Sequence, residues 1–111
     1  MALLTVQLPT LSGPTFTAAA AAGGGDTFAN TGAEYFYINN AGVGSITVTF
    51  DSPGTCSFNV TANAAHDTVV SVGAGVAKII GPFPKIRFND TSDIVSVTYS
   101  GVTSVTVAVL R

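Results

Sequence analysis

The residues of this chain that could do covalent chemistry are few and poorly spaced for it. Nucleophilic catalysis needs a base beside a nucleophile, and the only histidine, His66, is followed directly by Asp67. Neighbouring residues on an extended chain point to opposite faces, so these two do not form a base and the group that orients it. Cys56 lies in a strand pattern without a basic neighbour, which is typical of a packed side chain. We expect no catalytic residue and therefore no enzyme.

The sequence also contains few residues that could bind a metal ion or a cofactor. One cysteine and one histidine cannot provide a zinc ligand set. The stretch Asn89-Asp90-Thr91-Ser92-Asp93 lacks the alternate ligands of an EF-hand loop, so a turn is favoured there, while cation binding by Asp90 and Asp93 stays open. Gly23-Gly24-Gly25 precedes no helix, which argues against a phosphate loop. A hydrolase would need two of the six scattered acids to converge, and the sequence leaves that alternative open. We expect no metal and no cofactor.

The composition suggests a protein whose surface is covered by other protein. Charged residues make up 9% of the sequence and hydrophobic residues 47%, whereas soluble domains normally carry charge at about a quarter of their positions. The polar remainder is mostly Thr, Ser, Asn and Gly. Four cationic residues and a net charge of -2 give no basic footprint, so nucleic-acid binding is not expected. The chain is typical of a subunit in an assembly.

The sequence carries no pattern that indicates secretion or insertion into a membrane. A single cysteine excludes a disulfide within the chain. The first residues lack the basic stretch and apolar core of a signal peptide, and the run 18–22, followed by three glycines, is too short to span a bilayer. We expect a protein made in the cytoplasm that contacts no membrane.

The dominant hydrophobic period is two, which predicts β-strands. Apolar and polar residues alternate in four runs, Ser45–Phe50, Ser57–Thr61, Ser92–Ser100 and Thr103–Leu110. Gly, Pro, Asn and Asp clusters separate these runs at short intervals. At 111 residues we expect a single all-β domain, 1–111. The architecture predicted is an antiparallel β-sandwich of jelly-roll type with about eight to ten strands, with an immunoglobulin-like sandwich as the alternative.

The N-terminal region differs from these strand runs. It is rich in Ala and Gly and carries no charge before Asp26. Residues 1–30 are therefore predicted to form an extended arm that reaches another protein of the assembly or a neighbouring copy of this chain. A helix over Thr17 to Ala22 competes, because Ala is the best helix former. That stretch has no cap and ends in glycines, so a short strand or irregular arm is favoured.

Aromatic and aliphatic side chains supply the candidate interface. Tyr35, Phe36 and Tyr37 are consecutive, so Phe36 faces opposite to its two neighbours, and one of the two faces lies outside the core or in an interface. The interface residues we predict are Leu3, Leu4, Val6, Phe16, Phe28, Tyr35, Tyr37 and Phe83.

Four ordered segments give the chain a family resemblance. They are PTFTAAAAAGGGDTFAN, EYFYINNAGVGSITVTF, GVAKIIGPFPKIRFND and VSVTYSGVTSVTVAVLR. Together they resemble small virion structural proteins of tailed bacteriophages, in particular capsid decoration (cement) proteins. The resemblance covers nearly the whole chain, with its most telling pieces at Gly23 to Thr27, Asn39 to Thr49 and Gly81 to Pro84. It departs from the family pattern at Cys56 to Asp67.

The resemblance implies a location, a partner and a stoichiometry. Decoration proteins are small β domains, commonly homotrimers, that sit on the outer surface of the phage head and clamp subunits of the major capsid protein. The partners implied are therefore the major capsid protein and further copies of this chain. The alternative is a module of the tail, neck or fibre that binds a receptor or glycan through Tyr35, Tyr37, Asp90 and Asp93. The absence of Trp weakens the glycan hypothesis.

Overall fold

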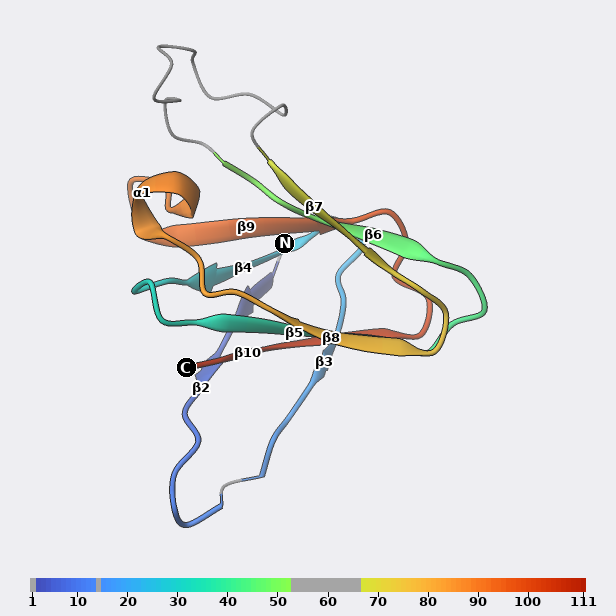
Figure 1. Ribbon diagram of the computed structural model, residues 1–111, viewed down its shortest axis with the longest axis horizontal. Coiled ribbons are helices and arrows are strands. Elements are labelled where there is room, and N and C mark those ends of the chain that lie inside the picture. The colour runs from blue at the N-terminus through green and yellow to red at the C-terminus, as the bar shows by residue number, and fades with distance from the viewer. Residues whose placement is uncertain (1, 14, 53–66) are drawn as a thin grey trace.

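The computed structural model describes residues 2–13, 15–52 and 67–111, with Ala2 described by its backbone (Figure 1). These residues form ten strands and one four-residue helix, so the protein is all-β as expected. The elements are β1 (Ala2–Leu4), β2 (Val6–Gln7), β3 (Ala19–Ala20), β4 (Asp26–Ala29), β5 (Tyr35–Asn40), β6 (Ile46–Phe50), β7 (Thr68–Val72), β8 (Val76–Ile80), α1 (Lys85–Phe88), β9 (Ile94–Tyr99) and β10 (Val105–Leu110).

The strands build two mixed sheets, drawn in Figure 1 as an upper and a lower layer. Sheet A has the order β1-β4-β9-β6-β7, and sheet B has the order β2-β10-β5-β8, with β3 also paired to β10. Most pairs are antiparallel, but β1 runs parallel to β4 and β2 runs parallel to β10. The expectation of purely antiparallel pairing is therefore wrong at the N-terminus. The reason is that the chain continues from β1 at the edge of sheet A directly into β2 at the edge of sheet B, without reversing its direction.

One hydrophobic core lies between the sheets. Phe36 on β5 has its ring centroid 5.9 Å from that of Phe28 on β4 and 5.2 Å from that of Phe50 on β6, so contacts between the sheets are aromatic. Buried residues recur with period two in β5, β6 and β9, and in β10 apart from the additionally buried Ala108. The strands expected over Ser45–Phe50, Ser92–Ser100 and Thr103–Leu110 are confirmed, with somewhat shorter bounds. The predicted strand 57–61, together with Cys56 and His66, lies outside the described residues.

The N-terminal region is incorporated into the sheets far more than expected. β4 pairs with both β1 and β9, and its residues Asp26 and Phe28 are wholly buried. The arm predicted over residues 1–30 is therefore corrected: 8–13 and 15–18 belong to no strand. The short strand favoured over a helix near Thr17 to Ala22 is confirmed, since Ala19 and Ala20 pair with β10.

A buried carboxylate ties the end of β10 to the start of β5. Glu34 accepts hydrogen bonds from the backbone N–H groups of Thr31 (2.7 Å) and Ala33 (3.2 Å) and from Arg111 Nε (2.8 Å). Arg111 Nη2 lies 2.7 Å from the same carboxylate. Burial alone would raise the pKa of Glu34, but these hydrogen bonds outweigh it and lower the pKa below the usual value. Arg111 also donates its backbone N–H to Gln7 O (3.0 Å), which joins the N-terminal strand to this clamp.

Candidate functional site

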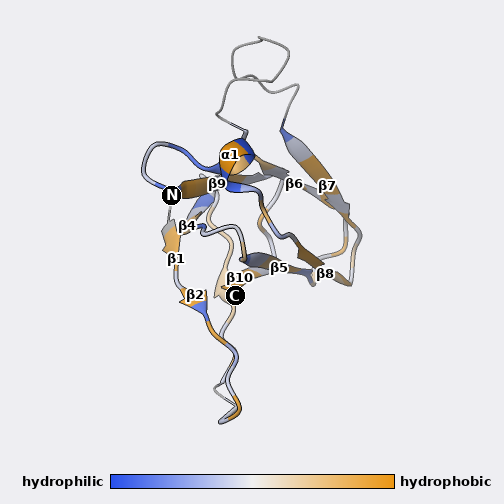
Figure 2. Cartoon of the chain, turned by 60° about the vertical axis from the view of Figure 1, so that its left-hand side comes forward, coloured by the Kyte–Doolittle hydropathy of each residue, from blue (hydrophilic) through white to orange (hydrophobic). Residues whose placement is uncertain are grey.

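The segment between β2 and β3 projects away from both sheets (Figures 1 and 2). We call residues 8–16 the finger; residue 14 is outside the described residues. Gln7 closes its base, because its side-chain amide donates to Thr17 O (2.6 Å) and accepts from Thr17 N (2.9 Å). A turn forms near the tip, where Gly13 N donates to Thr10 O (3.1 Å) and Gly13 adopts φ +67°. The finger is thus a defined loop with a closed base.

The finger exposes large apolar side chains. Leu11 near the tip is fully exposed, and Leu8 and Phe16 are 52% and 46% exposed. Hydrophobic positions along the finger appear orange in Figure 2. No charged residue precedes Asp26 in the sequence, so nothing charged on the finger compensates for this apolar surface. Exposed apolar area of this kind is typical of a contact surface.

The base of the finger contacts the outer face of sheet B through Phe16. The ring of Phe16 packs edge-on against Tyr37 on β5, with centroids 5.2 Å apart and planes at 89°. Tyr35 and Tyr37 point outward because Phe36 and Ile38 between and beyond them point into the core. Tyr37 pairs with Ile79 on β8, which is 64% exposed. We call this uncharged surface the apolar face; it comprises Phe16, Tyr35, Tyr37, Ile79 and Leu110.

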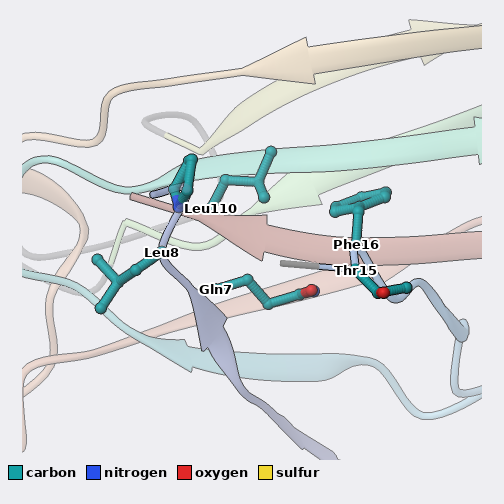
Figure 3. A pocket seen from close by; sticks show the side chains of 6 residues that line it. Gln7, Leu8, Thr15, Phe16 and Leu110 are labelled. Atoms are coloured by element: carbon teal, nitrogen blue, oxygen red, sulfur yellow. The ribbon is translucent and has the colours of Figure 1, made fainter. Parts of the chain in front are cut away.

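Two grooves flank the base of the finger. The first, of about 290 Å³, is lined by Gln7, Leu8, Pro9, Thr15, Phe16 and Leu110. Figure 3 shows Leu8 and Phe16 coming from the two ends of the finger, with Leu110 at the end of β10. The second, of about 430 Å³, lies between the N-terminal strands and β10, with Leu3, Ala19 and Ala108 among its lining residues. Both grooves are lined by uncharged residues and suit apolar side chains of a partner.

The structure separates the predicted interface residues into three groups, which are exposed, partly buried and fully buried. Phe16, Tyr35 and Tyr37 lie together on the apolar face, and Leu3 is exposed on β1. Leu4 and Val6 are partly buried and pack against the core.

The prediction that Phe28 and Phe83 belong to an interface is corrected. They are 0% and 2% exposed, and their ring centroids lie 5.4 Å apart inside the core. Phe28 lies on the inward-facing side of β4, where the residues buried are Asp26 and Phe28. A partner of the folded chain cannot contact either ring.

Sequence reasoning missed Leu8, Leu11 and Ile79. The leucines carry a usable signal, since each is an uncharged apolar residue close to a proline or glycine in a segment without strand periodicity. Ile79 carries none, because Ile80 follows it and a pair of isoleucines does not reveal which one faces out.

Tyr99 and the buried Asp26 form a polar pair. Tyr99 donates its hydroxyl to Asp26 Oδ2 (2.6 Å), and burial together with the Asp26 carboxylate raises the pKa of Tyr99. In the described part of the chain Asp26 Oδ1 has no hydrogen-bond partner. Asp26 is wholly buried, so solutes do not reach it. The pair supports the turn after Ala22, whose N–H donates to Asp26 Oδ2 (3.2 Å).

Two acids do converge, at Asp51 and Asp67. Ser52 N donates to Asp67 Oδ1 (2.8 Å), and burial followed by the neighbouring Asp67 raises the pKa of Asp51. Both residues adjoin the stretch 53–66, which lies outside the described residues. Convergence of two carboxyls is what a hydrolase would require, but it does not by itself define a substrate site.

The acids of the 89–93 turn are used internally. Asp90 Oδ1 accepts from Ser92 N (2.7 Å) and Ile94 N (3.1 Å), and Asp93 Oδ1 accepts from Asn89 Nδ2 (3.3 Å). Within residues 2–13, 15–52 and 67–111, no three His, Cys, Asp or Glu side chains gather as a metal site would require. No helix in the described residues is long and apolar enough to cross a membrane.

Comparison with known proteins found no family model, no curated protein and no solved structure that matches the chain.

Proposed function

We propose that this chain is a non-enzymatic structural protein of a tailed-bacteriophage virion, a decoration protein on the outer surface of the head. It binds the shell and stabilises contacts between subunits of the major capsid protein. The proposal is supported by the resemblance of four sequence segments to such proteins and by a surface with little charge. The single observation that carries it is the finger, which presents Leu8, Leu11 and Phe16 to solvent.

The chemistry of the finger defines the surface it would bind. An uncharged apolar loop gains most from an apolar cleft, since burying a leucine removes its side chain from water without leaving a charge unpaired. One such contact per copy is weak. A shell repeats it in fixed geometry, and each bound copy stabilises the assembled state in proportion to its occupancy.

The proposed architecture is a sandwich of jelly-roll type. The two sheets share one core, and the segments β1–β2 and β7–β8 each pass from one sheet to the other. Such crossings are expected where two sheets are wound from a single folded ribbon. The immunoglobulin-like sandwich is the alternative. In either architecture, the short strands β1 and β2 would be extra strands paired in parallel to β4 and β10.

The test is binding of single-residue variants to purified shells that lack this chain. Leu11→Asp places a charge on the exposed finger without touching the core, so we expect the folded variant to lose occupancy at least about tenfold. Val43→Asp is the matched control, because Val43 is equally exposed in the turn between β5 and β6. Occupancy is counted by mass spectrometry against the major capsid protein. Full occupancy by Leu11→Asp would contradict the proposal.

The second candidate is a receptor- or glycan-binding module of the tail, neck or fibre. The observation favouring it is that Tyr35 and Tyr37 share an outward face with Phe16, as aromatic binding platforms require. A few dozen copies per particle, with glycan binding that is lost in Tyr37→Ala, would support this candidate. Hundreds of copies in fixed ratio to the major capsid protein would support decoration.

A further inference from the structure

In the described part of the chain, β8 is an edge strand of sheet B, and no further strand pairs with its outer edge. Four of its five residues are exposed, and the fifth, Ile80, is half-buried. Only Lys78 among them is charged. Protein edge strands usually carry guards such as charge, proline or a covering segment, because their free N–H and C=O groups pair readily with another strand.

The single charge on β8 is directed away from the strand's own edge. Lys78 lies on the inward side of sheet B, opposite Ile38, and its ammonium donates to Ser71 O on β7 at 2.7 Å. The lysine therefore forms a hydrogen bond to a backbone carbonyl of β7, the edge strand of sheet A. The outward side of β8 presents Ala77 and Ile79, which carry no charge.

We propose that β8 pairs antiparallel with β8 of a second copy of this chain, about a two-fold axis that places Ile79 opposite Ile79 of the second copy. Sheet B would then continue from one molecule into the other. A two-fold axis brings each surface against itself, so the surface must not repel its own copy. The uncharged outward side of β8 meets that condition, whereas a charged peptide would find no counter-charge there.

The register follows from the side chains. A symmetric pair centred on Lys78 would set two ammonium-bearing residues directly opposite each other, which is unfavourable. A pair centred on Ile79 instead covers the most exposed apolar residue of the strand. Because Tyr37 is the neighbour of Ile79 in sheet B, the apolar face would run as one row, from Tyr37 through both isoleucines to the second Tyr37.

The pairing predicts a weak dimer. It covers one strand per copy, which is at the small end of protein interfaces, under about 1,200 Å² in total. We expect a dissociation constant on the order of 0.1 mM for the free chain. A two-fold contact gives even-numbered assemblies, in place of the trimer that the family resemblance implies. The inference concerns the free chain and does not depend on binding to a shell.

The first test is sedimentation of the free chain over a concentration series around that value. Ile79→Lys would set two lysines opposite each other, so we expect at least a tenfold weaker association. The matched control is Ile86→Lys, the same substitution at an isoleucine of α1 that is even more exposed. The control should dimerise like the wild type. Thermal unfolding confirms that both variants fold.

The second test fixes the register by disulfide formation in a Cys56→Ser background. Directly opposed strand residues come close enough for a disulfide, so Ile79→Cys should crosslink with oxidised glutathione. Ala77→Cys is the matched control, because its two copies would be offset by roughly 13 Å along the strands. Efficient crosslinking of Ala77→Cys with none at position 79 would overturn the register and with it the proposal.

Three further results would overturn the pairing. The wild type could remain monomeric throughout the series, it could sediment as a trimer, or Ile79→Lys could associate as well as the wild type. If the free chain is monomeric and Ile79→Lys loses shell binding, the edge of β8 belongs to the shell and not to a second copy. Loss of shell binding in Leu11→Asp, with dimerisation intact, would separate this inference from the proposed function.

Discussion

Two strands of sheet B, β10 and β8, are built from similar residues, but only one of them has its outer edge covered by further strands. β10 is covered along its outer edge by β2 and β3, and the Glu34–Arg111 clamp fastens its end. β8 has no covering strand among the described residues and is exposed along nearly its whole length. The chain thus uses its own N-terminal segment to cover the outer edge of β10, while in the described residues no strand covers β8.

The difference shows that composition does not reveal which strand is protected. VTVAVL in β10 and VAKII in β8 are both rich in Val, Ala and Ile or Leu, yet four of six residues in the first are buried and none in the second. Protection of an edge depends on which other segment pairs with it. We expect substitutions to disturb stability at the closed edge and association at the open one.

The largest contrast should come from the same acidic substitution at each edge. Val6→Asp places a carboxylate on β2 where Val6 packs against the core, and we expect it to lower the free energy of unfolding by about 2 kcal/mol. Ile79→Asp on β8 should change it by less than about 0.5 kcal/mol, since the side chain is solvent-exposed. Urea denaturation measures both. Equal losses at the two positions would mean that the edges do not differ as described.

A smaller loss is expected when the clamp at the closed edge is weakened. Glu34→Gln keeps the shape of the side chain but removes the charge that accepts from Thr31, Ala33 and Arg111. We expect a loss of roughly 1–2 kcal/mol, mostly from weaker hydrogen bonds to the backbone, because the Arg111 side chain is 37% exposed and water screens its ion pair. Denaturation at neutral pH measures it. No change from the wild type would show that the clamp does not stabilise the edge.

The pH dependence of stability sharpens the same point. The pKa of Glu34 is lowered in the folded chain, so the stability it contributes is complete above the unfolded value near 4.5. That contribution should disappear as the pH falls below 4.5 and through the lower folded pKa. The difference in unfolding free energy between wild type and Glu34→Gln should therefore shrink in acid, and other acids such as Asp51 cancel in that difference. A difference that is constant with pH would contradict the assignment.

The smallest effect on stability is expected at the open edge. Lys78→Met removes the hydrogen bond to Ser71 O, which is exposed and replaceable by water, so unfolding should change by less than about 0.5 kcal/mol. The same change removes the only charge on β8, and we expect self-association to strengthen several-fold. Denaturation and sedimentation report the two effects separately. Weaker association than in the wild type would show that Lys78 itself holds the second copy.

The strands with regular alternation were predictable from the sequence. Thr47 and Thr49 alternate with Val48 and Phe50 in β6, and the same period marks β9 and β10. β1 and β2 were not predictable, because strands of two or three residues are too short to show a period. They exist because they pair with β4 and β10, whose positions are set by other contacts.

The candidate site was predicted in part, for a related reason. Tyr35 and Tyr37 were identified from alternation, and Phe16, which was predicted beside them, packs against Tyr37. Phe28 and Phe83 were also predicted as interface residues and are core residues. Aromatic type signals a large contact area but does not say whether the contact is inside the chain or outside it.

The sequence by itself determined the class of the protein. It is an all-β chain with little charge, few residues suited to catalysis or metal binding, and an uncharged N-terminal region. Only the tertiary structure decided that this region covers the outer edge of β10 and presents a finger, and that β8 has no covering strand within residues 2–13, 15–52 and 67–111. Alternation and composition act over a few neighbouring residues, so they can be read along the chain. Coverage of an edge joins β2 to β10, at opposite ends of the sequence, and it depends on the packing of both sheets around one core.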